Sequence, residues 1–288
     1  TMAESLVTGI EDIGVSVMTL RKVTDLAERA QAISQAGFKA MGLRLSDYEM
    51  ALDSMHSQEI TELLAKYDVA VPEIEFLREW IGMSGDPQYD DEEERLFAMA
   101  DQLGSRHINV GVFDKKYSFS DVTTAYRGLC KRAGEHGLIV QIEPMPYTPP
   151  VDSLPLGQRV VESARESDQL NAGLLVDVWH YMRMLRSAEA LVKVPPELIT
   201  GVQLGDVMAQ PLSDVVQEAR HHRAVPGEGV VDLQKFLKTL GDHGCQDVAV
   251  GVEIMSDNLD AMDPALAMQR VAAGLQKALF LGDLSSKH

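Results

Sequence analysis

The sequence predicts a (β/α)8 TIM barrel that spans residues 1–288 as a single domain. Short apolar runs that suit β-strands alternate eight times with longer segments whose apolar residues recur at helical spacing. Such alternation indicates parallel strands joined by crossover helices. The length of 288 residues suits a closed barrel, which typically needs about 250 residues. A Gly-x-Gly-x-x-Gly motif after the first strand and a linker rich in proline or glycine are both absent from the sequence, which disfavours a dinucleotide-binding sheet and a second domain.

The elements follow one another at regular intervals. The expected strands are Ile13–Leu20, Ala40–Leu45, Ala70–Phe76, His107–Phe113, Leu138–Met145, Ala172–Trp179, Ile199–Val207 and Asp247–Met255. Glycine marks the expected ends of four intervening helices, at Gly37, Gly104, Gly137 and Gly244. Two long irregular stretches, Met83–Asp91 and Met208–Arg223, follow the third and seventh strands. Both fall on the side of the barrel where active sites are built.

Composition excludes several classes of partner. The formal net charge of -18 repels a phosphate backbone, so we expect no nucleic-acid partner. No apolar run reaches the roughly 18 to 20 residues that span a bilayer, so we expect no membrane association. The two cysteines, Cys130 and Cys245, lack metal-type spacing, and the acidic N-terminus lacks a signal pattern. These features predict a cytoplasmic protein with free thiols.

Four consecutive expected strands end in a side chain with a metal-binding oxygen. Glu143, Asp177, Gln203 and Glu253 stand near the carboxyl ends of the fifth to eighth strands. Three carboxylates that converge inside one barrel must take up protons or bind a cation. Carboxylate and carboxamide oxygens are hard donors, so the sequence predicts one divalent ion, Mn²⁺ or Mg²⁺.

The same region resembles a known superfamily. The segments Ile142-Glu143-Pro144, Asp177-Val178-Trp179-His180, Val202-Gln203-Leu204-Gly205-Asp206, Arg223-Ala224-Val225-Pro226-Gly227-Glu228-Gly229 and Val252-Glu253 carry the likeness. They resemble the xylose isomerase-like barrels of the sugar-phosphate isomerase/epimerase superfamily, which includes hydroxypyruvate isomerases, D-tagatose 3-epimerases and inosose dehydratases. The resemblance covers most of the chain. It implies that the four strand-end residues bind the metal ion and that Glu143 and Glu253 also act as acid and base.

Further substrate contacts are expected around this centre. The resemblance implies that His180 contacts a substrate oxygen and that Arg223 reaches a substrate hydroxyl or enediolate oxygen. Trp179 is a candidate for an apolar wall of the site. One of Glu73 and Glu75 should face the barrel interior, and we take Glu75 as the candidate substrate contact. The resemblance also implies a homodimer or homotetramer.

This arrangement predicts an enzyme that acts on a small carbohydrate-like hydroxy-carbonyl compound. A metal-bound carbonyl acidifies its α-proton, one glutamate removes that proton, and the other returns it. Return of the proton gives an isomerase or epimerase, which is our main prediction. Protonation of a β-hydroxyl instead gives a dehydratase or lyase, which is the alternative. A non-catalytic sugar-binding barrel is less favoured. An apurinic endonuclease is disfavoured as well, because this chain lacks the additional histidine ligands that such an enzyme needs.

Overall fold

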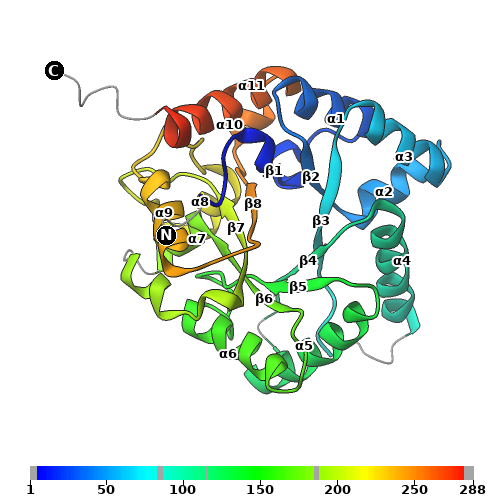
Figure 1. Ribbon diagram of the computed structural model, residues 1–288, viewed down its shortest axis with the longest axis vertical. Coiled ribbons are helices and arrows are strands. Elements are labelled where there is room, and N and C mark those ends of the chain that lie inside the picture. The colour runs from blue at the N-terminus through cyan, green and yellow to red at the C-terminus, as the bar shows by residue number, and fades with distance from the viewer. Residues whose placement is uncertain (1–4, 83–86, 115, 185–187, 282–288) are drawn as a thin grey trace.

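The computed structural model, which describes residues 5–82, 87–114, 116–184 and 188–281, is a closed barrel of eight parallel strands inside a ring of helices (Figure 1). Each strand pairs with its neighbours in sequence, and β1 closes the barrel against β8. The strands are β1 Gly14–Val15, β2 Ala40–Leu43, β3 Ala70–Leu77, β4 His107–Val110, β5 Ile139–Ile142, β6 Ala172–Asp177, β7 Ile199–Leu204 and β8 Ala249–Val252. The predicted fold class is confirmed.

The helices begin and end at residues that suit those positions. They are α1 Leu26–Gln35, α2 Leu45–Leu52, α3 Ser57–Lys66, α4 Pro87–Leu103, α5 Phe119–Gly134, α6 Leu154–Arg165, α7 Val178–Met184, α8 Val215–His221, α9 Leu233–His243, α10 Asp257–Asp260 and α11 Pro264–Leu275. Ser118 starts α5 with a capping box that it forms with Asp121. The four glycines predicted to end helices all adopt positive φ angles, which glycine tolerates without steric cost.

Several expected strands are longer than the observed ones. The chain leaves the sheet after Val15, because the Ser16 side chain accepts a hydrogen bond from Met18 and starts a 3-10 helix over Val17–Leu20. Strand β6 ends at Asp177 rather than Trp179, and α7 begins at once. The stretch Met208–Arg223 is not wholly irregular, since it contains α8. In the other expected stretch, residues 83–86 lie outside the described part and Pro87 begins α4.

The apolar core lies between the strand ring and the helices. Apolar strand residues pack outward against the helices, and polar side chains fill the barrel interior. Asn109 donates to Glu73 at 2.6 Å, and Gln141 donates to Glu73 at 3.0 Å and to Asn109 at 2.7 Å. This polar layer underlies the carboxyl ends of the strands. In the described part of the chain, no helix combines the length and the apolar character needed to cross a bilayer.

His107 makes the fold sensitive to acid. The ring is buried on β4, and neither ring nitrogen has a hydrogen-bond partner among the described residues. Burial lowers the pKa of His107 from 6.5 to about 4. Above pH 6.5 the ring is neutral in both states; below it the unfolded chain binds the proton first, so stability is lost as the pH falls towards 4.

We expect His107→Leu to remove that part of the acid sensitivity. Between pH 7 and pH 4 the free energy of unfolding of the variant should fall by about 3 kcal/mol less than that of the wild type. Urea denaturation at a series of pH values measures this difference. The same change at the exposed His56 is the control. Parallel pH curves for the wild type and His107→Leu would contradict the prediction.

Candidate active site

The four predicted ligands meet at the carboxyl end of the barrel, where each is at most 2% exposed. Asp177 ends β6 and Gln203 lies in β7, whereas Glu143 and Glu253 directly follow β5 and β8. Parallel strands present their carboxyl ends at one edge, which is why residues far apart in sequence converge here. Gln203 Nε2 donates to Glu253 Oε2 at 3.2 Å. The sequence-based grouping therefore corresponds to one buried cluster.

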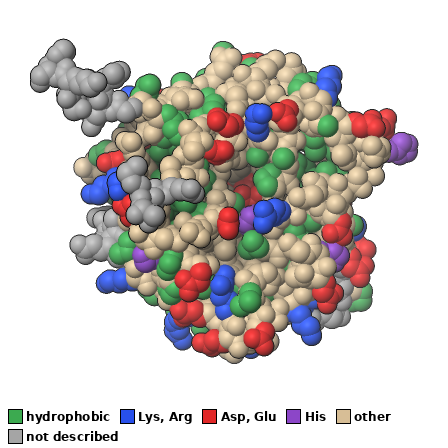
Figure 2. Space-filling model, viewed as in Figure 1, with side chains coloured by type: hydrophobic (Ala, Val, Ile, Leu, Met, Phe, Trp, Pro, Cys, Tyr) green, Lys and Arg blue, Asp and Glu red, His purple; other side chains and the backbone are tan. Residues whose placement is uncertain are grey.

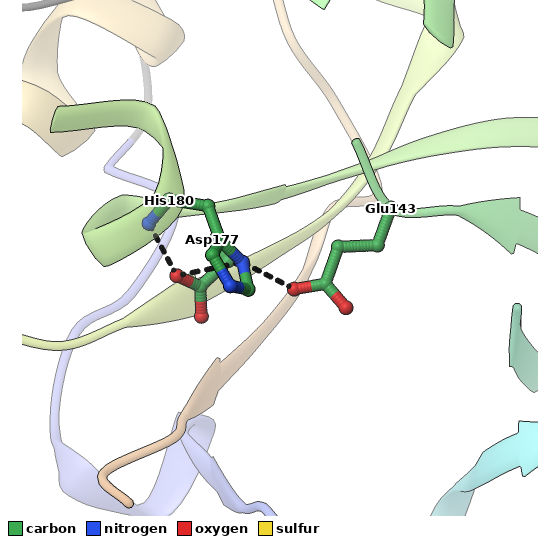
Figure 3. Close-up of side chains that lie close together, drawn as sticks. All are labelled: Glu143, Asp177 and His180. Carbon is green, nitrogen blue, oxygen red and sulfur yellow. Dashed lines mark hydrogen bonds and ion pairs between the residues drawn. The ribbon is translucent and has the colours of Figure 1, made fainter. Parts of the chain in front are cut away.

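His180 directly contacts two members of this cluster, which the sequence did not predict. Because the strand ends at Asp177, the first turn of α7 returns His180 to the strand end, and its backbone N–H donates to Asp177 Oδ1 at 2.8 Å. Its Nδ1 lies 2.9 Å from Glu143 Oε1 and 3.4 Å from Asp177 Oδ1 (Figure 3). Candidate ligand atoms of the three side chains lie within 4.8 Å of one another, a spacing that suits a metal ion.

A fourth carboxylate, that of Glu75, adjoins the cluster. Its Oε1 accepts from Gln203 Nε2 at 3.0 Å, and its Oε2 accepts from the Val17 backbone at 2.7 Å. Ser16 lies within hydrogen-bonding distance of both Glu75 and Glu253. Gly42 leaves room for Glu75, because a Cβ on Gly42 would lie 2.2 Å from Glu75 Oε2. Glu75 is therefore fixed within the centre rather than free at its edge.

The expectation that one of Glu73 and Glu75 faces the barrel was wrong. Both point inward, since residues two apart in a strand share a face. Glu73 lies one layer deeper, where it accepts hydrogen bonds from Asn109 and Gln141. Glu75 lies at the level of Gln203.

Burial shifts the acidities of these groups strongly. Burial, aided by the charge of Asp177, raises the pKa of Glu143 well above its usual range. Burial likewise raises the pKa of Glu75 well above normal, and it raises that of Glu253 to about 7 against the opposing effect of Arg223. Burial lowers the pKa of His180 to about 4. The centre therefore favours a bound cation or bound protons.

Arg223 supplies one positive charge. Its Nη1 donates to Asp177 Oδ2 at 3.0 Å and to Glu253 Oε1 at 3.1 Å, and its Nε donates to the Ala219 carbonyl. Although burial acts to lower the pKa of Arg223, Asp177 and Glu253 raise it above its ordinary value. The arginine is 3% exposed, so it is held among the carboxylates rather than displayed to solvent.

Trp179, predicted to contact substrate, lies behind the site. The strand ends before it, so it does not alternate onto the inner face with Asp177. It is fully buried against Val207 and Ala219, with the Arg223 guanidinium 5.2 Å from its ring centroid. It is not among the described residues that line the cavity, and the prediction of a substrate contact is corrected to a packing position behind Arg223.

Asp206 fixes the loop that follows Arg223. Its Oδ2 accepts from the Gly227 and Gly229 backbones at 3.0 Å, and its Oδ1 accepts from the Val207 and Val231 backbones at 2.9 Å. The Asp206 backbone also pairs with Ala224, next to Arg223. A fully buried carboxylate thus binds the backbones of both glycines of the Arg-x-x-Pro-Gly-x-Gly pattern.

A cavity of about 560 Å³ opens above the cluster. Figure 2 shows this face hollowed near its centre, with acidic side chains inside the hollow. The lining includes Glu75, Glu143, His180 and Glu253 together with Tyr147 and Phe113. Tyr147 was missed by sequence reasoning; its hydroxyl lies 3.0 Å from His180 Nε2. Its position after Pro144 and Pro146 gave no signal, because only the folded loop turns the phenol towards His180.

A family model described as "Xylose isomerase-like TIM barrel" matches residues 30–278. The chain belongs to this family. The predicted superfamily is thereby confirmed, and the match contains all of the cluster described above.

Two curated relatives share one name. A 3-dehydroshikimate dehydratase of Pseudomonas putida is 25% identical over 92% of this chain, and one of Pseudomonas aeruginosa is 24% identical over 95%. The chain spans only 41% and 42% of the lengths of these relatives.

Solved structures share the barrel. A zinc-bound IolI protein covers 93% of this chain and 97% of its own at 17% identity with a TM-score of 0.80. The probable 3-dehydroshikimate dehydratase AsbF of Bacillus anthracis covers 88% of this chain and 97% of its own at 16% identity, with a TM-score of 0.70. A D-psicose 3-epimerase of Clostridium cellulolyticum covers 92% of this chain and 97% of its own at 14% identity, with a TM-score of 0.68. At these identities the likeness shows the fold.

We expect Asp206→Asn to destabilise the protein and to impair the site. The new amide group would face two backbone N–H donors, so the free energy of unfolding should fall by about 2–3 kcal/mol. Chemical denaturation measures the loss. Asp214→Asn is the matched control, because asparagine still caps α8 at that exposed position and should change stability by less than about 0.5 kcal/mol. Equal effects of the two changes would show that other contacts hold the loop.

Proposed function

We propose that this barrel is a divalent-metal-dependent dehydratase that removes water from a small hydroxy ketone of the 3-dehydroshikimate type. The observation that carries the proposal is the buried cluster of Glu143, Asp177, His180, Gln203 and Glu253 beneath an open cavity. The two dehydratase relatives, aligned along nearly the whole chain, favour this alternative over the isomerase or epimerase that was our main prediction.

The donor set fits a divalent ion. Glu143, Asp177 and Glu253 offer carboxylate oxygens, and Gln203 Oε1 is buried without a hydrogen-bond partner among the described residues. His180 adds a nitrogen within reach of Glu143 and Asp177. We propose that the four strand-end residues hold the ion, with His180 beside it. Oxygen donors favour Mn²⁺ or Mg²⁺, while the zinc-bound neighbour makes Zn²⁺ the competing choice. When bound, such an ion polarises a carbonyl and stabilises negative charge on its oxygen.

The chain's own groups supply the proton transfers. One of Glu143 and Glu253 takes the proton from the carbon next to the ketone, and the electrons of that C–H bond form a C=C bond. The β-hydroxyl leaves as water with a proton from the second carboxyl group, so the net change is the loss of one water molecule. His180 is neutral because burial lowers its pKa to about 4, so it can donate from Nδ1 to Glu143 and accept at Nε2 from Tyr147. Loss of water from 3-dehydroshikimate and enolisation of the product yields 3,4-dihydroxybenzoate.

Turnover should depend on the metal. A chelator should abolish activity, and Mn²⁺ or Mg²⁺ should restore it. Asp177→Ala should lose metal, as measured by elemental analysis of the purified protein, because two flanking carboxylates alone leave a weaker donor set. Asp257→Ala, which removes an exposed carboxylate that pairs with His221 and Arg21, should retain it. Full activity after complete chelation would refute the metal-dependent proposal.

Isotope exchange should distinguish the roles of Glu143 and Glu253. Glutamine keeps an oxygen but cannot accept a proton, so Glu143→Gln and Glu253→Gln should each lose on the order of 10²–10⁴ in rate. In D2O, the variant that lacks only the acid should still exchange the α-proton of 3-dehydroshikimate without releasing water. The variant that lacks the base should do neither. Proton NMR of the substrate follows the exchange, and near-wild-type rates in both variants would exclude the two-glutamate mechanism.

Turnover assays with two kinds of substrate separate a dehydratase from an isomerase or epimerase. With 3-dehydroshikimate, a dehydratase forms the aromatic product, which ultraviolet absorbance reports directly. With a panel of keto-sugars, an isomerase or epimerase forms a new sugar and incorporates solvent deuterium. Turnover of keto-sugars but not of 3-dehydroshikimate would reverse the choice made here.

A further inference from the structure

We infer that Arg44 and Arg78, which follow β2 and β3, form a subsite that binds a carboxylate of the substrate across the cavity from the acidic cluster. This inference rests on the proposed function and names the substrate class more closely as cyclic hydroxy ketones that bear a carboxylate. Both arginines line the cavity that also contains Glu143, His180 and Glu253. Strands β2 and β3 lie across the closed barrel from β6 and β7.

Arg44 is held rigidly in place. Its Nε donates to Asp47 Oδ2 at 2.7 Å and its Nη2 donates to Asp47 Oδ1 at 3.1 Å. Asp47 also pairs with the buried Arg29 at 3.5 Å. Two guanidinium groups thus share one carboxylate, so Arg29, Arg44 and Asp47 together carry a net positive charge. Arg44 Nη1 has no hydrogen-bond partner among the described residues, so a donor of this preorganised side chain remains for a ligand.

Arg78 is a cation with no carboxylate partner in the described part of the chain. Its guanidinium lies 4.7 Å from the centroid of the Phe113 ring, and Phe113 meets Phe76 edge to face at 6.1 Å. Stacking on an aromatic face orients the guanidinium but leaves its N–H donors unused. By contrast, Arg21 and Arg95, which also line the cavity, are paired with acidic side chains.

The surroundings suit a flat ring that carries an anion. Phe76, Phe113 and Met145 give this part of the cavity an apolar wall. Guanidinium groups bind carboxylates in bidentate geometry, and a site of this kind discriminates strongly against a neutral analogue. In a chain of net charge -18, an anionic substrate needs local cations of this kind. A ring held by its carboxylate near β2 and β3 would present its other edge to the cluster at β5 to β8.

Arg220 is the alternative cation. It lines the cavity from α8, on the β7 side, and has no acidic partner within the described part of the chain. It lies next to His221 and His222 rather than against an aromatic wall, and β7, the strand that precedes α8, carries Gln203 of the cluster. Arg220→Gln is therefore the matched control, because it removes an equivalent charge from the same cavity on the side where the reaction is proposed.

The test pairs two substrates with each enzyme form. The kcat/KM of the metal-loaded wild type should be about 10–100-fold higher for 3-dehydroshikimate than for its carboxamide. Arg78→Gln should lower the value for the acid by a similar factor, mainly through KM, and leave the amide within about threefold. Arg220→Gln should preserve the preference for the acid. A preference that survives Arg78→Gln, or that disappears in Arg220→Gln, would overturn the assignment of Arg78.

Arg44 needs a substitution that keeps its positive charge, because glutamine would remove one of the two cations that pair with Asp47. Arg44→Lys keeps the charge but cannot make the bidentate contact with Asp47, so it should reduce the preference for the acid by about three- to tenfold. A circular dichroism melt of each variant shows whether it is folded. An unchanged preference in a folded Arg44→Lys variant would remove Arg44 from the subsite.

Equilibrium binding separates this inference from the proposed function. Calorimetry with 3,4-dihydroxybenzoate and 3,4-dihydroxybenzamide should show a preference for the acid in the wild type that Arg78→Gln abolishes. That result without any turnover of 3-dehydroshikimate would refute the dehydratase and leave the subsite intact. Turnover with no such preference would refute the subsite and leave the dehydratase. If the wild type binds neither compound, the subsite is wrong.

Discussion

The arrangement of the barrel mouth depends on the electrostatic cost of gathering carboxylates in a dry interior. Glu75, Glu143, Asp177 and Glu253 are at most 2% exposed, and an isolated buried carboxylate costs far more free energy than folding can supply. Arg223 bridges Asp177 and Glu253 and so offsets part of that cost. Its single charge leaves the others to bind protons or a further cation. The raised pKa values of the glutamates express the same demand, which a divalent ion would satisfy.

Secondary contacts turn this electrostatic demand into a defined geometry. Asp206 binds four backbone N–H groups and fixes the loop behind Arg223, so a buried carboxylate outside the cluster positions a cation inside it. Gly42 leaves space for Glu75, and Ser16 connects Glu75 to Glu253. These supports come from β2 and from the segments that follow β1 and β7. The site therefore depends on closure of the whole ring of strands.

The fold and the four strand-end residues were predictable because both follow from short-range regularity. Strand periodicity fixes which side chains share a face, and parallel strands place their carboxyl ends together. Predictions failed where the chain departs from that regularity. Trp179 was assigned to a strand that ends two residues earlier, and the helix that replaces it brings His180 to Glu143 instead. The parts played by Ser16 and Tyr147 depend on contacts between distant segments, which no local pattern encodes.

In the reaction that we propose, the outcome is decided by groups other than the carboxylates that would start it. Abstraction of an α-proton is common to isomerisation, epimerisation and dehydration, so Glu143 and Glu253, as the proposed acid and base, would define the half-reaction rather than the product. The product depends on which bond of the intermediate is aligned with a proton donor, and that alignment is set by how the rest of the substrate is held. The holding groups that we propose in this cavity are Arg44 and Arg78, which follow β2 and β3 and line the cavity together with Phe76 and Phe113. Substrates anchored there by a carboxylate would present a fixed edge to the acid and base, and elimination of a β-hydroxyl is the outcome that a ring so oriented makes accessible.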